Sequence, residues 1–185
     1  MKGQIFIAGA ALFVVLLALI ATSLVVAPAM STALAVAPQL DNLAQEYRYT
    51  IGLSSIDKID RLAELSAYFR TNVQGFDAIY ALISVQPPTY VLTIGNFLRN
   101  PVTVSIIANS NPAASGAIAD KESKNWSFSA AGSVQLTINY TIQNSTYTKS
   151  LMFAADSNQT IGWFDIGIMA DRNNIMQSDV WNVTE

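Results

Sequence analysis

An uncharged stretch near the start of the chain constrains the fold more than any other feature. Between Lys2 and Asp41 the chain has 38 consecutive residues without a charge. Within this stretch the 22 residues of Ile5–Val26 are apolar except for Thr22 and Ser23. A helix of that length would be about 33 Å long, which matches the hydrocarbon core of a bilayer. The sequence therefore predicts a membrane-spanning helix at about residues 5–26.

The flanking charges give this predicted span an orientation. Lys2 precedes it, whereas Asp41 and Glu46 follow it. The positive-inside rule then places the N-terminus in the cytoplasm and the rest of the chain outside the cell. We expect a single pass through the cell membrane, with an extracellular C-terminal domain.

The uncharged stretch is longer than one membrane span, and it extends to Leu40. Two interpretations are open. A continuous helix to about Tyr49 would need other apolar surfaces to cover it, as in a bundle of identical helices in a filament core. Alternatively, Pro28 ends or kinks the helix, because proline removes a backbone donor, and an Ala-rich stalk packs on its own domain.

Composition excludes most catalytic chemistry. The chain has no histidine and no cysteine, and only 12% of its residues are charged. It therefore lacks the side chains for Ser-His triads, histidine-ligated metals, disulfides and thiolate sites. The net charge of −3 gives no basis for nucleic-acid binding. We expect no enzymatic activity, no cofactor and no metal.

The first residues carry a resemblance to a known family. Lys2, Gly3 and Gln4 stand directly before the apolar run that begins at Ile5. This start resembles the class III (prepilin-type) signal sequence of archaeal type IV pilin-like proteins, over about 25 residues. The resemblance implies a leader of residues 1–3 and cleavage by a prepilin peptidase between Gly3 and Gln4. One departure is Ala8, which stands where many pilins have glutamate at the fifth mature position.

Residues 50–88 have helical periodicity. Ser54 is a candidate helix start, and Asp57 and Arg61 are spaced for a weak surface ion pair. Apolar residues at helical spacing form one stripe at Ile56, Ile59, Leu62, Leu65 and Phe69, and a second at Phe76, Ile79, Tyr80 and Ile83. We expect this amphipathic region to pack on its own domain and to end at Pro87-Pro88.

The period changes to two in residues 89–185. Val134–Ile142 alternates apolar and polar residues, as a half-buried strand does, and six or seven such runs follow Pro88. Residues 109–124 carry no motif, and we expect a loop there. The predicted fold class is α+β: a long N-terminal apolar transmembrane helix (4–49), a short helical region (50–88) and an antiparallel Ig-like β-sandwich (89–185).

The candidate modification sites lie in this C-terminal half. Five Asn-x-Ser/Thr sequons are candidate N-glycosylation sites, at Asn125, Asn139, Asn144, Asn158 and Asn182. Four carboxylates are interpreted as solvated loop residues rather than a metal site, namely Asp156, Asp165, Asp171 and Asp179. The three tryptophans, Trp126, Trp163 and Trp181, are expected in the sandwich core.

Together these features predict a structural, type IV pilin-like glycoprotein of the cell surface. It would be a filament subunit or minor pilin in adhesion or surface attachment. The resemblance implies self-assembly through the apolar helix, with a prepilin peptidase and the pilus assembly machinery as partners. The alternative is an unprocessed, single-span envelope protein that stays anchored in the membrane and is stator-like or binds the surface layer.

Overall fold

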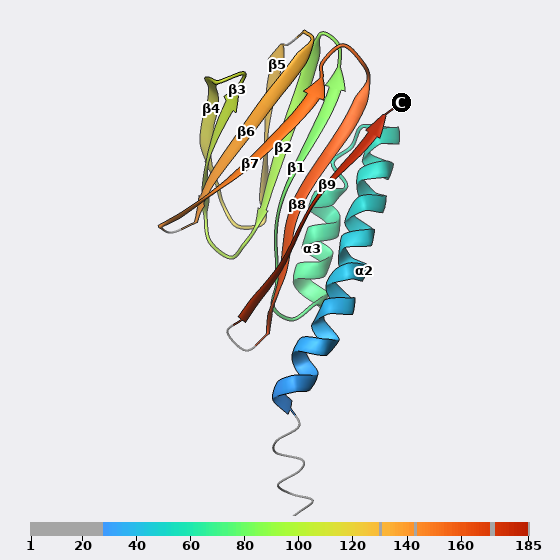
Figure 1. The fold of residues 1–185 in the computed structure, drawn as a ribbon, viewed down its shortest axis with the longest axis vertical. Coiled ribbons are helices and arrows are strands. Elements are labelled where there is room, and N and C mark those ends of the chain that lie inside the picture. Colours follow the sequence, from blue (N-terminus) through green and yellow to red (C-terminus); the bar gives the residue numbers. More distant parts are fainter. Residues whose placement is uncertain (1–27, 130, 143, 171–172, 185) are drawn as a thin grey trace, which may run out of the picture. The chain divides into compact units, whose positions relative to one another are not determined.

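The computed structural model describes residues 28–129, 131–142, 144–170 and 173–184 (Figure 1). The chain divides into two units, residues 1–38 and 39–185, and the packing described below lies within the second. The expected span at residues 5–26 lies outside the described residues, as do Gly3 and Gln4.

Two helices precede the strands. Helix α2 is Pro28–Asp57 and helix α3 is Leu62–Asn72. From Leu40 onward α2 buries residues at helical spacing, and these are Leu40, Leu43, Ala44, Tyr47 and Ile51. The face of α3 that is buried carries Leu62, Ser66 and Phe69. Both helices are therefore amphipathic and cover a surface of their own domain.

The break between the helices falls after the predicted helix start at Ser54. Ser54 lies in the last turn of α2, where its carbonyl accepts a hydrogen bond from the Lys58 N–H at 3.0 Å. Lys58 has a positive φ of 59°, which turns the chain toward α3. The predicted start at Ser54 is therefore wrong. The predicted ion pair between Asp57 and Arg61 is confirmed.

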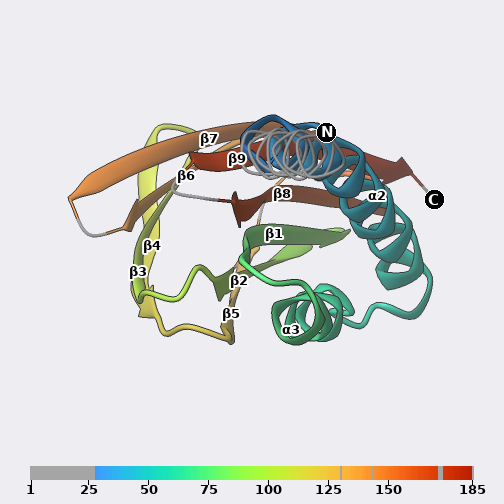
Figure 2. The same cartoon turned by 90° about the horizontal axis from the view of Figure 1, so that it is seen from below.

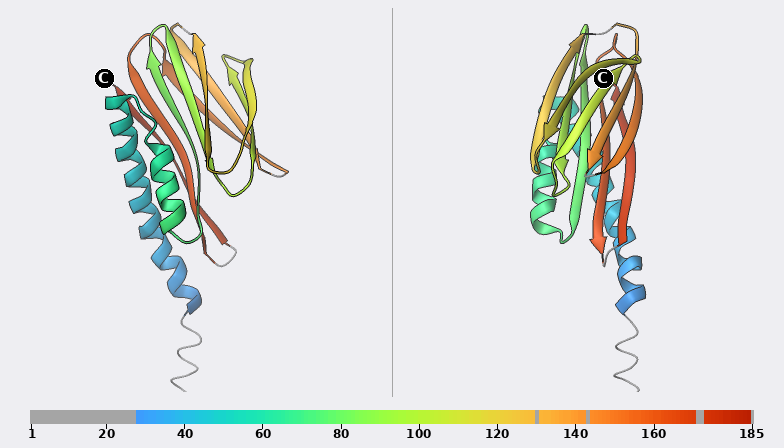
Figure 3. Two further views of the ribbon diagram at one scale, coloured as in Figure 1. Left: turned by 180° about the vertical axis from the view of Figure 1, so that it is seen from behind. Right: turned by 90° about the vertical axis from the view of Figure 1, so that its left-hand side faces the viewer.

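Nine antiparallel strands follow in the described part of the chain. They are β1 (Phe76–Gln86), β2 (Thr89–Phe97), β3 (Val102–Ala108), β4 (Asn111–Ile118), β5 (Glu122–Ser129), β6 (Ser133–Ile142), β7 (Ser145–Ala154), β8 (Gln159–Ala170) and β9 (Asn173–Thr184). One sheet has five strands in the order β5-β2-β1-β8-β9, and the other has four in the order β4-β3-β6-β7. Figure 3 shows the two sheets face to face.

The main core lies between the sheets. The five-stranded sheet contributes alternate residues, such as Ile79, Ile83 and Trp163, and the four-stranded sheet contributes residues such as Val104 and Ile138. All five of these side chains are fully buried. Alternation along each strand follows from the pleat, which turns successive side chains to opposite faces.

A second buried layer covers the other face of the five-stranded sheet. There the ring of Tyr47 from α2 lies 5.0 Å from that of Phe164 on β8, measured between centroids. Phe69 of α3 lies 5.5 Å from Phe76 of β1. The Tyr47 hydroxyl shares a hydrogen bond of 2.5 Å with Ser66, which joins the two helices. Figure 2 shows α3 beside β1 and β2. Strands β1 and β8 and the second half of β2, at the centre of the five-stranded sheet, are thus buried on both faces.

These observations correct the predicted fold class. The described chain is mostly antiparallel β-sheet, and the α+β assignment is wrong. Neither described helix combines the length and the apolar character needed to cross a bilayer. The strands begin at Phe76 rather than at residue 89. Strands β8 and β9 lie beside β1 in the five-stranded sheet, so the order of strands differs from the ABED and CFG sheets of the immunoglobulin fold.

Two local predictions also fail. The apolar residues of Phe76–Ile83 do not form a helical stripe, because they lie in strand β1. Residues 109–124 are not a loop, because they contain β4 and the start of β5. The alternating run Val134–Ile142 is confirmed as a strand, within β6.

Close packing at Gly95 allows a test of the second buried layer, between the helices and the five-stranded sheet. A Cβ atom at Gly95 would overlap the ring of Tyr80, whereas one at Gly52 in α2 would meet nothing within 4 Å. We expect Gly95→Ala to lower the free energy of unfolding by about 1–3 kcal/mol, as overpacked sites do. Gly52→Ala should raise it by about 0.5–1 kcal/mol, because alanine favours a helix. Urea unfolding measures both, and equal effects from the two variants would contradict this packing.

Candidate functional site

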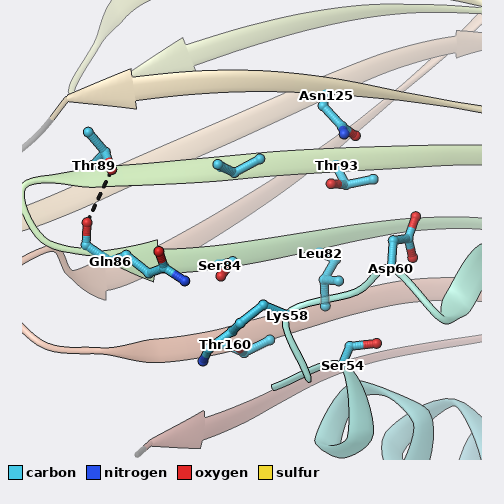
Figure 4. A pocket seen from close by; sticks show the side chains of 11 residues that line it. Ser54, Lys58, Asp60, Leu82, Ser84, Gln86, Thr89, Thr93, Asn125 and Thr160 are labelled. Carbon is cyan, nitrogen blue, oxygen red and sulfur yellow. Dashed lines mark hydrogen bonds between the residues drawn. The ribbon is translucent and has the colours of Figure 1, made fainter. Parts of the chain in front are cut away.

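A polar pocket of about 220 Å³ lies on the helix-side face of the five-stranded sheet, beside the C-terminal end of α2 (Figure 4). Its walls come from the end of α2, the turn after it, and strands β1, β2, β5 and β8. Its lining residues are Ser54, Lys58, Asp60, Leu82, Ser84, Gln86, Thr89, Val91, Thr93, Asn125 and Thr160. Most of these side chains carry a hydroxyl or an amide.

Strand register brings the polar side chains together. Leu82 of β1 pairs with Thr93 of β2, and Thr93 pairs in turn with Asn125 of β5. In a neighbouring row, Ser84 of β1 pairs with Thr160 of β8. Because paired residues point to the same face, each row adds polar side chains to one continuous surface.

Thr160 is the most deeply buried of these polar residues. It is 1% exposed, and its hydroxyl has no hydrogen-bond partner among the described residues. A buried hydroxyl without a partner loses the hydrogen bonds that water would give it, which costs free energy. No described protein group therefore satisfies the Thr160 hydroxyl.

Two residues of opposite charge, Asp60 and Lys58, line the pocket. The Asp60 carboxylate accepts a hydrogen bond from the Tyr80 hydroxyl at 2.7 Å and one from the Leu62 N–H at 3.1 Å. Burial raises the pKa of the Asp60 carboxyl above its ordinary value, and these hydrogen bonds oppose that shift. Lys58 stands two residues earlier in the same turn and also lines the pocket. The pocket lining thus carries one acid and one base.

The five candidate glycosylation sites are spread along the chain from β5 to β9. Asn125 is exposed on β5 and Asn182 on β9, while Asn144 and Asn158 are exposed in the segments before β7 and β8. Asn139 is half-buried in β6, where its side-chain oxygen accepts a hydrogen bond from the Thr148 hydroxyl at 2.7 Å. Of the five, Asn125 lines the pocket.

The described members of the four carboxylates considered in the sequence lie in different environments. Asp156 is exposed, Asp179 pairs with Arg48, and Asp171 lies outside the described residues. No group of three or more histidine, cysteine or acidic residues within the described ranges could hold a metal ion.

Asp165 corrects the expectation of a solvated carboxylate. It lies on the inward face of β8 and is 5% exposed. The Tyr140 hydroxyl donates to it at 2.7 Å, and the Lys149 ammonium lies 3.1 Å from its other oxygen. A buried carboxylate needs such partners, because desolvation penalises an isolated charge. These contacts connect the two sheets.

The tryptophans divide between core and surface. Trp163 is fully buried, and Trp126 is partly buried against the main core. Trp181 is 43% exposed, with the Arg48 guanidinium 5.8 Å from its ring centroid. The expectation of a core position is therefore wrong for Trp181.

Comparison with known proteins identifies no relative of this chain. No family model, curated protein or solved structure matches this chain.

Sequence reasoning did not identify the pocket. Its residues come from six separate segments, and serine, threonine and asparagine on strands are ordinary surface residues. The one local indication is the polar alternation of β2, where Thr89, Val91 and Thr93 share a face. That alternation does not reveal which segments lie beside it.

The raised pKa of Asp60 predicts a pH-dependent effect of Asp60→Asn. The unfolded chain releases this proton near the ordinary value of 3.8, and the folded chain releases it at higher pH. Stability therefore falls as pH rises through that window, and the full penalty remains at neutral pH. Asparagine cannot ionise, so the variant should gain thermal stability relative to the parent between about pH 3 and pH 7.

Asp57→Asn is the matched control. The Arg61 guanidinium lowers the pKa of the Asp57 carboxyl, so this variant should lose stability relative to the parent over the same range. Thermal unfolding at several pH values measures both differences. A pH-independent difference between Asp60→Asn and the parent would contradict the assigned shift.

Proposed function

We propose that this chain is a structural, pilin-like protein of the cell surface, a filament subunit or minor pilin in adhesion or surface attachment. The observation that carries the proposal is the position of Lys2-Gly3-Gln4, directly before an uncharged apolar segment. A prepilin peptidase would cleave there, between Gly3 and Gln4. The apolar segment would then anchor the chain in the cell membrane before it joins a filament.

The arrangement of the described residues supports this proposal. From residue 39 onward, helix α2 exposes polar residues on one side, and its other side packs through Leu40, Leu43 and Tyr47 on a β-rich domain. The folded domain therefore includes the part of α2 that follows residue 38. With its N-terminus inside the cell, the chain would present this domain outside, where the exposed sequons could carry glycans.

Processing of the N-terminus tests the proposal. In the native host we expect the intact mass of the chain from the cell envelope to correspond to a start at Gln4. Gly3→Leu should leave residues 1–3 attached, because the leader of this class ends in glycine. Gly9→Ala, a glycine change beyond the expected cleavage site, should be processed normally.

A parent chain that still begins at Met1 in the envelope would overturn the filament proposal. It would favour an unprocessed, membrane-anchored envelope protein that is stator-like or binds the surface layer. Mass increments at the sequons in the same spectrum would report glycan occupancy independently of cleavage.

A further inference from the structure

We propose that the polar pocket beside the end of α2 binds one uncharged sugar residue. This inference concerns residues 54–160 of the folded domain and does not depend on cleavage or filament assembly. It rests on the size of the pocket, the chemistry of its lining, its buried unsatisfied hydroxyl and its balance of charge.

The size of the pocket limits its occupant. A volume of about 220 Å³ is below the roughly 300–1,000 Å³ of pockets that enclose drug-sized ligands. It is far above the roughly 30 Å³ that one water molecule occupies in the liquid. An occupant of the size of a monosaccharide fits between these limits.

The lining matches a ligand with many hydroxyl groups. Ser84, Thr89 and Thr93 supply hydroxyls that both donate and accept hydrogen bonds, and Gln86 and Asn125 supply amides. Leu82 and Val91 each add an apolar side chain, which suits the C–H faces of a sugar ring. Figure 4 shows Leu82, Ser84 and Gln86 on β1, Thr89 and Thr93 on β2, and Asn125 on β5.

Thr160 supplies an independent reason to expect a ligand. Its hydroxyl is buried and has no partner in the described part of the chain, although Thr160 lines the pocket. Buried polar groups in native proteins are nearly always hydrogen-bonded, so an unsatisfied one needs an explanation. A sugar bound beside Ser84, which pairs with Thr160 across the strands, would bring a hydroxyl close to it.

Charge balance favours a neutral occupant. Asp60 and Lys58 both line the pocket, with opposite signs. The Asp60 carboxylate already accepts hydrogen bonds from Tyr80 and Leu62. An anionic ligand would meet the like charge of Asp60 and a cationic ligand that of Lys58, whereas an uncharged polyol would meet neither.

The sugar could come from two sources. Asn125 is a candidate glycosylation site, and its side chain extends from β5 toward Thr93 at the pocket (Figure 4). A glycan attached to Asn125 would place its first sugar at the pocket. A saccharide of the cell envelope or of a surface to which the protein attaches would present the same chemistry from outside.

Saturation-transfer NMR on the full chain tests binding. The chain is produced in a bacterial host without N-glycosylation and kept in a detergent without a sugar headgroup. The probes are the methyl glycosides of glucose, galactose, mannose and N-acetylglucosamine. We expect at least one to bind with a low-millimolar Kd, since so small a ligand has few atoms with which to bind.

Thr160→Val is the decisive variant because valine keeps the shape of threonine and removes its hydroxyl. We expect a loss of affinity of about fivefold, the effect of one neutral hydrogen bond. The thermal midpoint should not fall, because the hydroxyl has no protein partner to lose. Thr137→Val, the same change on the outer face of the other sheet, should leave binding unchanged. Absence of binding to every glycoside, or equal binding by Thr160→Val and the parent, would overturn the proposal.

Comparison with the native glycoprotein distinguishes the two sources. If the glycan of Asn125 fills the pocket, native protein should not bind the free glycoside, and Ser127→Ala, which removes the sequon, should restore binding. If the ligand is external, native and bacterial proteins should bind equally. Either result supports a sugar-binding pocket and identifies its occupant.

Discussion

Cover on both faces of the central strands of the five-stranded sheet is the constraint on which the rest of the domain depends. In β1, every residue from Ala78 to Ile83 is buried. Alternate side chains meet the four-stranded sheet on one face, and the others meet Tyr47 and the helices on the opposite face. A small domain gains most of its stability from such burial, since apolar area removed from water is the main favourable contribution to folding.

The pocket follows from where this cover stops. Helix α2 ends at Asp57, and beyond it the helix-side face of the sheet carries Ser84, Thr93 and Thr160 in place of large apolar residues. The same sheet therefore has an apolar part under the helices and a polar part beside their ends. In the proposed surface protein, the first part stabilises the domain and the second offers a site for a sugar.

Alternation of polar and apolar residues predicted β6, which has one exposed face, and failed for β1, which is buried on both faces. Val134–Ile142 alternates because β6 has a solvent face, and its prediction was correct. Strand β1 lacks that alternation, so its apolar residues at Phe76, Ile79 and Ile83 matched a helical stripe by chance. Asp165 was placed in solvent because its partner Lys149 comes from another strand, and local sequence does not predict that contact. The pocket was missed for the same reason.

Backbone hydrogen exchange of the full chain tests the two-sided cover most directly. Strands β1 and β6 each pair with a neighbour on both edges, but only β1 lies in the sheet that the helices also cover. We predict slower exchange in peptides from β1 than in those from β6, and a smaller difference in Tyr47→Ala, which removes part of the helix-side layer. Equal or faster exchange in β1 of the parent chain would contradict the account.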